Sequence, residues 1–366
     1  MDEHAKPAGP LRTGFTTGAC ATGAAQAAFQ ALLSGAFPGP VVVHLPKGQK
    51  VNFALAEASL TSGVARAGII KDAGDDPDVT HGALIRAEVQ RLSAGQGVRF
   101  RAGEGVGMVT LPGLPIAVGE AAINPVPRRM MTEAFVALAS TYGTTPDAEI
   151  TISIPGGAKL AERTLNARLG IVGGLSILGT TGIVIPYSCS AWIHSIERGI
   201  DVARALGLKH VAGATGRTSE AAVKALYDLP EAALIEMGDF AGGMLKYLRR
   251  HPIERVTIAG GPAKLAKLAA GHLDLHSKRS RADSRGLAAL AVEIGLDPAI
   301  TGAIEKTDSV AQALVLAKDG APRLVAAIAA KAQATARDVL ASSATPIVLD
   351  LVVIDREGRV IGRAGP

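Results

Sequence analysis

A long uncharged run of the chain, residues 169–196, constrains the fold more than any other feature. Its sequence reads LGIVGGLSILGTTGIVIPYSCSAWIHSI, which is long enough to cross a bilayer as a helix. However, five glycines and Pro186 interrupt the run, and in a helix interior each glycine costs about 1 kcal/mol and a proline about 3. The run therefore predicts a buried strand and glycine-rich turns that line a cofactor pocket. The alternative is a tightly packed crossing of the core that holds no ligand.

The composition predicts two or three domains with an aliphatic core. The chain has 366 residues, and a domain takes roughly 150. Hydrophobic residues make up 48% of the sequence but aromatic residues only 3%, and the 43 glycines suit an α/β protein with tight turns. The net charge of +5 favours an acidic partner. Nucleic acid is not expected, because the sequence has no dense basic run and few aromatic side chains for base stacking.

The cysteines and the N-terminus indicate a cytoplasmic, soluble protein. Cys20 and Cys189 lie far apart and neither belongs to a CxxC motif, so no disulfide framework is expected and a reducing compartment fits. The first ten residues, MDEHAKPAGP, lack the basic and apolar regions of a signal peptide and are expected to form a loose tail. No membrane partner is expected, and homo-oligomerisation stays open.

The pattern of strands and helices divides the rest of the chain. Residues 11–168 are expected to form an α+β domain without regular strand–helix alternation. Across residues 169–285 four short apolar strands, GIVIPYS, HVAGATG, ALIEMG and RVTIAGG, each lead into an amphipathic helix. This alternation predicts a parallel sheet of the Rossmann-like, doubly wound type. Residues 286–366 are expected to be helical and to end in a β-hairpin turning at residues 356–358, which returns to an existing sheet because an isolated hairpin is marginally stable.

Ligands of such sheets bind at the carboxyl ends of the strands. In this chain those ends are residues 187–188, 213–217, 238–240 and 260–264. Two nucleotide motifs are incomplete within the uncharged run. Gly174 and Gly179 have the spacing of a P-loop, but Thr180 stands where its lysine should be. GxGxxG is absent, and the first acid downstream, Glu197, falls inside the expected helix, which argues against NAD.

Several clusters of polar residues are candidates for chemistry. The segment KDAGDDPDVTHG carries four aspartates, Asp72, Asp75, Asp76 and Asp78. Such carboxylates can bind a cation or act as bases, and they also cap turns, so both interpretations stay open. Glu104, between two glycines, favours an acidic loop that faces a pocket.

The histidines do not predict a metal site. His272 and His276 are four residues apart, but no HExxH motif or third ligand accompanies them. His276 with Lys278, Arg279 and Arg281 is better interpreted as a donor-rich loop for carboxylates. Asp239, at a strand-to-helix turn, suits either a helix N-cap or contact with a ligand hydroxyl or amine.

Six segments together carry a resemblance to a known family. They are RTGFTTGACATGAA, KDAGDDPDVTHG, GEGVGMVTLPGLPIAVGEAAINPVPRRM, LNARLGIVGGLSILGTTGIVIPYS, EMGDFAGGML and GPAKLAKLAAGHLDLHSKRS. In this order they resemble the CbiD family, the cobalt-precorrin-5B C(1)-methyltransferases of anaerobic cobalamin biosynthesis. The resemblance covers about three-quarters of the chain.

The resemblance implies a reaction and a domain arrangement. A methyl group would pass from S-adenosylmethionine to C-1 of a cobalt-bearing contracted tetrapyrrole, giving cobalt-precorrin-6A and S-adenosylhomocysteine. It also implies an N-terminal domain similar to the second domain of ribosomal protein S5, joined to a Rossmann-like domain.

Candidate site residues follow from this reaction, which needs alignment and exclusion of water more than an acid or base. No catalytic residue is therefore secure, and the candidates are Asp72, Asp75, Asp76, Glu104 and Asp239. For the cofactor we expect contacts from Gly173, Gly174, Gly179, Thr180, Thr181, Gly182 and Asp239. For the polycarboxylate tetrapyrrole the candidates are Thr16, Thr17, Arg128, Arg129, His276, Lys278 and Arg279.

Two other functions stay open. One is a nicotinamide-dependent oxidoreductase, and the other is a non-catalytic tetrapyrrole carrier with no affinity for S-adenosylmethionine. The chain is expected to depart from common Rossmann methyltransferases, because it lacks their glycine fingerprint and the acid after the second strand. Their way of binding the cofactor therefore cannot be assumed here.

Overall fold

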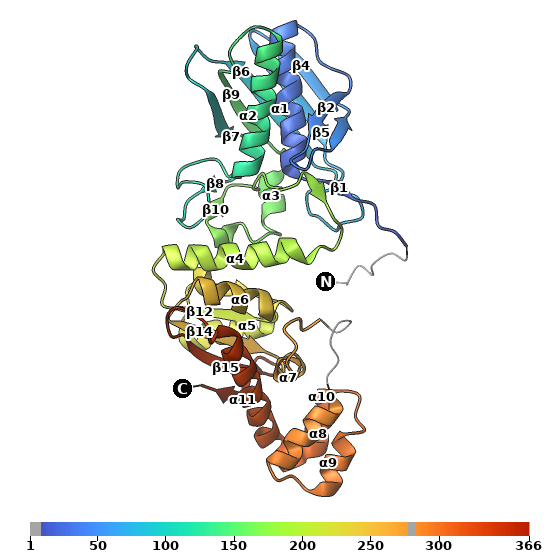
Figure 1. Ribbon diagram of the computed structural model, residues 1–366, viewed down its shortest axis with the longest axis vertical. Helices are drawn as coiled ribbons and strands as arrows, with labels where there is room; N and C mark the ends of the chain where they lie inside the picture. Colours follow the sequence, from blue (N-terminus) through green and yellow to red (C-terminus); the bar gives the residue numbers. More distant parts are fainter. Residues whose placement is uncertain (1–8, 277–282, 366) are drawn as a thin grey trace. The chain divides into compact units, whose positions relative to one another are not determined.

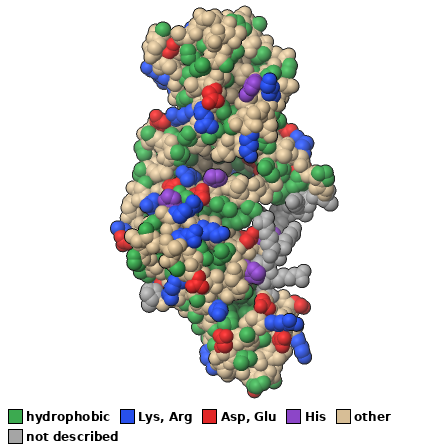
Figure 2. Space-filling view, in the orientation of Figure 1, with side chains coloured by type: hydrophobic (Ala, Val, Ile, Leu, Met, Phe, Trp, Pro, Cys, Tyr) green, Lys and Arg blue, Asp and Glu red, His purple; other side chains and the backbone are tan. Residues whose placement is uncertain are grey.

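The computed structural model describes residues 9–276 and 283–365. The chain divides into two compact units, Met1–Cys189 and Ser190–Pro366, and each unit has a buried hydrophobic core of its own. The first unit includes most of the uncharged run, which the sequence pattern assigned to the second domain. No helix within the described ranges is long and apolar enough to cross a membrane. On the face shown in Figure 2, basic and acidic side chains are interspersed over each unit.

The first unit packs two helices against a five-stranded sheet (Figure 1). Helix α1 (Thr17–Ser34) lies on β5 and β6, and α2 (Pro125–Thr141) lies beside α1. The strand order is β4 (Glu57–Thr61), β5 (Val64–Ile70), β6 (Leu84–Arg91), β9 (Ala148–Ser153), β7 (Val98–Ala102). All neighbours are antiparallel except β7 and β9.

Small side chains let α1 approach this sheet closely. The helix begins after Thr16, whose hydroxyl oxygen accepts a hydrogen bond from the Ala19 N–H at 3.2 Å, and it ends at Gly35 in a left-handed conformation. All seven of its alanines are fully buried. Phe29 of α1 stacks on Phe135 of α2 with ring centroids 4.1 Å apart, so an aromatic pair joins the two helices in a mainly aliphatic core.

Short strands and turns complete the first unit. They comprise a hairpin of β2 (Val41–His44) and β3 (Lys50–Phe53), a ladder of β8 (Met108–Val109) with β10 (Ile171–Val172), a ladder of β1 (Gly14–Phe15) with β11 (Ile183–Val184), and the short helix α3 (Gly157–Ala161). The sequence pattern predicted a strand of the parallel sheet over residues 182–188. This prediction was wrong, because β11 has two residues and pairs antiparallel with β1.

The second unit is built on a largely parallel sheet. Its order is β13 (Leu234–Glu236), β12 (His210–Ala214), β14 (Arg255–Gly260), β15 (Val348–Ile354), β16 (Val360–Ala364). The first four strands are parallel, and β16 returns antiparallel to β15. The C-terminal hairpin therefore extends the sheet that β12 to β14 begin.

Helices cover both faces of this sheet. One face shares a core with α4 (Cys189–Ala205), α6 (Ala241–Arg250), α7 (Pro262–Ala269) and α11 (Ala321–Leu340). The other face packs against α5 (Arg217–Tyr227), whose Val223 lies in a separate cluster with Ala212 and Ala259. Between α7 and α11 the chain forms α8 (Ser284–Glu293), α9 (Pro298–Ile304) and α10 (Val310–Ala317).

Candidate functional site

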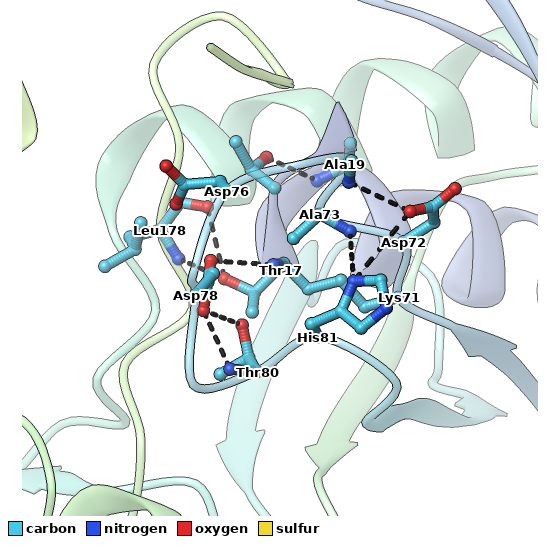
Figure 3. A network of polar contacts seen from close by, with 12 residues as sticks. Thr17, Ala19, Lys71, Asp72, Ala73, Asp76, Asp78, Thr80, His81 and Leu178 are labelled. Atoms are coloured by element: carbon cyan, nitrogen blue, oxygen red, sulfur yellow. Dashed lines mark hydrogen bonds and ion pairs between the residues drawn. The ribbon is translucent and has the colours of Figure 1, made fainter. Parts of the chain in front are cut away.

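Three segments that are distant in sequence meet at the N-terminus of α1. They are residues 12–19, residues 71–82, here called the acidic turn, and residues 170–188, here called the glycine segment (Figure 3). The Thr16 N–H donates to the Gly182 carbonyl at 3.0 Å, and the Gly18 N–H donates to the Leu178 carbonyl at 2.9 Å. The Phe15 N–H donates to the Asp72 carbonyl at 2.7 Å. Backbone hydrogen bonds thus join the first turn of the helix to both other segments.

The two threonines proposed for substrate binding are engaged in this junction. Thr17 Oγ1 accepts from the Leu178 N–H at 3.0 Å and lies 3.2 Å from the Leu178 carbonyl oxygen, to which it donates. Thr16 caps the helix, as described above. Both side chains are buried, with 7% of Thr16 and 4% of Thr17 exposed. Their hydroxyls therefore hold the glycine segment and the helix in place.

Most glycines of the glycine segment are needed for contacts within the chain. A Cβ on Gly174 would lie 2.3 Å from the Gly105 backbone, and one on Gly179 would lie 2.3 Å from Thr16 Oγ1. A Cβ on Gly182 would lie 2.5 Å from Leu45. These distances are shorter than a carbon contact allows. A side chain would have to displace backbone at Gly174, and the side chains of Thr16 and Leu45 at the other two positions.

Two positions of the glycine segment are open. Gly173 is exposed, and a Cβ there would have no neighbour within 4 Å. Thr180 is exposed, whereas the Thr181 hydroxyl donates to the Ile183 carbonyl at 3.2 Å. Of the six expected cofactor contacts in this segment, Gly173 and Thr180 are exposed, Gly179 and Thr181 are half-buried, and Gly174 and Gly182 are buried.

The aspartates of the acidic turn all have partners within the chain. Asp72 forms an ion pair with Arg12, whose hydrogen bond, with one from the Gly74 N–H, lowers the pKa of Asp72 to about 2. Asp75 accepts from the Arg12 N–H at 2.6 Å. Asp76 accepts from the Tyr187 N–H at 2.8 Å. The turn is thereby connected to the residues that precede β1 and to the end of the glycine segment.

Asp78 pairs with a buried lysine. The Lys71 ammonium lies 2.7 Å from Asp78 Oδ2, and only 1% of the Lys71 side chain is exposed. Thr80 donates to Asp78 Oδ1 from its hydroxyl at 2.6 Å and from its N–H at 2.7 Å. Burial raises the pKa of Asp78, but Lys71 and the Thr80 hydrogen bonds outweigh that effect and leave the pKa below its usual value.

The hydrogen bonds of the acidic turn are contacts that turn-forming aspartates make. Among the described residues, no group of three or more His, Cys, Asp or Glu side chains is arranged to hold a metal ion.

Cys20, in the first turn of α1, is fully buried. Burial raises the pKa of its thiol to about 12, so it stays protonated at neutral pH.

The other candidates of the first unit lie around the same junction or on its surface. Glu104 is exposed and accepts from the Gly156 N–H at 3.3 Å. The Arg128 guanidinium donates to the carbonyls of Ile123 at 2.8 Å and Ala121 at 3.0 Å. It also pairs with Glu120 at 2.9 Å. Arg128 thus holds the loop before α2, whereas Arg129 is exposed and lies 3.7 Å from Glu133.

A second group of candidates lies at the carboxyl ends of the strands in the second unit. Asp239 follows β13 and forms an ion pair with Lys264 of α7. The neighbouring Lys267 is buried and donates to the Leu275 carbonyl at 2.9 Å. Burial, and then the charge of Lys264, lower the pKa of Lys267. The His276 N–H donates to Asp274 at 3.1 Å, and Lys278 and Arg279 lie outside the described residues.

Sequence reasoning missed one acidic residue at this edge. The first strand of the parallel sheet is β12, so the second is β13, which ends at Glu236. The expectation that the chain lacks an acid after its second strand was therefore wrong. It failed because residues 182–188 were assigned as the first strand, which shifted the strand count by one. The signal was present in ALIEMGD, where an apolar strand ends at an acid.

These features define the class of protein. A parallel sheet with helices on both faces and polar side chains at its carboxyl edge is an α/β unit, and it follows a first unit with a mixed sheet. The chain belongs to the CbiD family. The family model described as CbiD matches residues 4–186, and that described as CbiD, C-terminal domain, matches residues 274–365.

Close relatives extend over nearly the whole chain. A protein of Paramagnetospirillum magneticum is 61% identical over 354 residues, which cover 97% of this chain and 98% of the relative. One of Agrobacterium fabrum is 59% identical, covering 96% and 93%. Both are named cobalt-precorrin-5B C(1)-methyltransferase. The crystal structure of the cobalamin biosynthesis protein cbiD from Archaeoglobus fulgidus is 30% identical, with a TM-score of 0.39, and covers 74% of this chain and 83% of that one.

Proposed function

We propose that the chain is a cobalt-precorrin-5B C(1)-methyltransferase that uses S-adenosylmethionine as the methyl donor. The observation that carries this proposal is the identity of 61% over 354 residues to a relative of that name. The match includes both units, so the proposal concerns the whole chain. The products are cobalt-precorrin-6A and S-adenosylhomocysteine.

The chemistry suits a site without a strong acid or base. C-1 of the tetrapyrrole attacks the sulfonium methyl in line, the carbon–sulfur bond breaks, and its electron pair leaves on a neutral thioether. Such a step depends on alignment and on exclusion of water. In the first unit Asp72, Asp75 and Asp76 accept hydrogen bonds from the chain itself. We therefore assign these three to shaping the acidic turn. Glu104 and Asp239 also have partners, Gly156 and Lys264, but Glu104 is exposed and Asp239 lies at the carboxyl ends of the strands, so both stay as candidates for ligand contact.

We propose that the open part of the glycine segment contacts the substrate or the cofactor. Gly173 presents exposed backbone next to Val172, whose ladder partner is Met108. Both side chains are exposed, so this corner offers an apolar surface to a large ring. We propose Arg129, His276, Lys278 and Arg279 as contacts for the tetrapyrrole carboxylates, because the net charge of the chain is positive.

The finer assignments are also proposals. We propose that the first unit is similar to the second domain of ribosomal protein S5, on the support of two helices against a mixed sheet. We propose that the second unit is Rossmann-like, on the support of its parallel strand order, and that the protein is cytoplasmic. A reducing compartment suits its two free cysteines.

The test is anaerobic incubation with S-adenosylmethionine and cobalt-precorrin-5B, followed by mass spectrometry of the tetrapyrrole. A gain of one methyl group with an equal amount of S-adenosylhomocysteine is expected. Binding of the tetrapyrrole without methyl transfer, and without affinity for S-adenosylmethionine, would support a carrier instead. A parallel titration with reduced nicotinamide nucleotide tests the oxidoreductase, which predicts saturable binding of that compound.

A further inference from the structure

The parallel sheet of the second unit has a point where its connections change direction. From β12 the chain passes through α5, on one face, to β13. The other neighbour of β12 is β14, which leads into α7 on the opposite face. In sheets of this kind the crevice outside the carboxyl ends of two such strands is where ligands bind. Here that crevice lies between residues 214–217 and residues 260–262.

The backbone at this crevice is accessible. The two strand ends are joined by a hydrogen bond from the Thr215 N–H to the Ala259 carbonyl at 3.0 Å. Gly216 is exposed and opens α5. A Cβ on Gly261 would have no neighbour closer than 3.9 Å, whereas one on Gly260 would lie 2.8 Å from the Thr215 side chain. Thr215 and bare backbone therefore form the floor of the crevice.

Glu236 lies beside this floor with its carboxylate available. It is the last residue of β13 and is paired in register with Ala214, the last residue of β12. Leu234 packs on the side of α5, and alternation along the strand directs Glu236, two residues later, to the same face. Among the residues that the structure describes, its carboxylate has no hydrogen-bond or ion-pair partner. Asp239, in contrast, is paired with Lys264.

A half-buried carboxylate with free acceptor oxygens suits two neighbouring hydroxyl groups. In dinucleotide-binding sheets an acid about 20 residues after the glycine turn accepts from the ribose hydroxyls. Glu236 follows Gly216 by 236 − 216 = 20 residues. In those sheets the second glycine of the turn lets the backbone approach the pyrophosphate. Here Thr215 occupies the corresponding position, and its side chain packs on Gly260. These features favour an adenosyl group without a pyrophosphate.

We infer that Glu236 binds the ribose hydroxyls of the adenosyl group of the methyl donor, in the crevice between β12 and β14. This inference rests on the proposed function, since it places the cofactor of that reaction. The role is in binding and orientation of the donor, and Glu236 takes no part in bond making.

The test uses the full-length protein and S-adenosylhomocysteine, which binds without reacting. Affinity is measured by calorimetry for S-adenosylhomocysteine and for its 2′-deoxy analogue, and Trp192 fluorescence gives a second signal. Trp192 is the single tryptophan of the chain, and its indole N–H donates to the Glu236 carbonyl at 3.0 Å. Glu236→Gln is expected to weaken binding of S-adenosylhomocysteine about tenfold or more, because hydrogen bonds to a charged acceptor are lost.

The preference between the two ligands separates a direct contact from a structural effect. The wild type is expected to prefer S-adenosylhomocysteine over the 2′-deoxy analogue, and Glu236→Gln is expected to abolish that preference. Glu254→Gln is the matched control, because Glu254 pairs with Lys209 just before β14 begins, and it should leave both affinities unchanged. If Glu236→Gln fails to fold, Glu236→Asp carries the test, with weaker binding and a reduced preference expected.

Each other result decides one of the two proposals. Wild-type affinity and preference in the Glu236→Gln variant would overturn the inference and leave the methyltransferase intact. Tighter binding of NADH than of S-adenosylhomocysteine would overturn the assignment to an adenosyl group without a pyrophosphate. No binding of S-adenosylhomocysteine by the wild type, together with no methyl transfer to cobalt-precorrin-5B, would overturn the proposed function itself.

Discussion

At the scale of single residues, the Lys71–Asp78 ion pair shows what holds the acidic turn in place. The lysine side chain is almost completely buried, and an isolated buried ammonium is costly. Asp78 and the hydrogen bonds from Thr80 offset that cost. The pair is close enough to α1 for the Lys71 charge to act on the Cys20 thiol, where it opposes the effect of burial on the pKa. The charge of Lys71 and the burial of Cys20 therefore act in opposite directions on the pKa of the same thiol.

Removal of Asp78 alone is expected to destabilise the first unit strongly. Asp78→Ala leaves the Lys71 ammonium buried without a counter-charge, so the free energy of unfolding should fall by about 3 kcal/mol. Glu88→Ala, which breaks the exposed Arg66–Glu88 pair in the same unit, should cost under about 1 kcal/mol. Urea denaturation followed by circular dichroism measures both values. Equal losses in the two variants would contradict this account of the buried pair.

At the scale of elements, the glycine segment carries more structure than its short strands suggest. It contributes one strand to each of two ladders, with β8 and with β1, and its carbonyls accept from the first turn of α1. Close contacts, rather than a regular element, explain why glycine occupies positions 174, 179 and 182: the first lies against backbone, and the other two lie against the side chains of Thr16 and Leu45. Of the two interpretations of residues 169–196, a tightly packed crossing of the core accounts for these three glycines.

Two adjacent glycines give a matched test of this explanation. In Gly174→Ala the new methyl group meets the Gly105 backbone, which cannot move aside as a flexible side chain would. We expect a loss of about 3 kcal/mol or more in the stability of the first unit. Gly173→Ala meets open space and strains only a positive φ of 86°, so about 1 kcal/mol is expected. Thermal unfolding measures the difference, and similar losses in both variants would argue against close packing at Gly174.

The sequence predicted the elements whose signals are local. Strands β12, β13 and β14 and their helices follow the alternation of apolar runs and amphipathic segments, because both patterns arise within a few residues. The pairing of β11 with β1 could not be predicted in this way, since the two strands are about 170 residues apart in the sequence. That one misassigned strand also concealed Glu236. The partners of Arg128 and Asp76 depend on tertiary contacts and were equally beyond local patterns.

At the scale of the whole molecule, each unit buries its own core. The core of the first unit is centred on α1, α2 and the sheet from β4 to β7. That of the second surrounds the parallel sheet. Cooperative unfolding usually belongs to one such core, so the free energy of unfolding is a property of each unit rather than of the chain.

We therefore expect two transitions in urea. Trp192 lies in the second unit, so its fluorescence should follow the unfolding of that unit, while circular dichroism follows both. Gly174→Ala should move the first unit's transition to lower urea concentration and leave the Trp192 transition in place. A single transition with the same midpoint for both signals, shifted as a whole by Gly174→Ala, would show that the two cores unfold together.

The capping of α1 by the glycine segment also bears on how the chain folds during synthesis. Thr17 and Leu178, which exchange hydrogen bonds, are separated by 161 residues. A ribosome adds roughly 5–20 residues per second, so the first turn of α1 waits about 8 to 32 seconds after its own synthesis before Leu178 is added. Until then the first turn of α1 and the acidic turn lack their hydrogen bonds to the glycine segment. The first unit can complete its fold only when Tyr187 has left the ribosome.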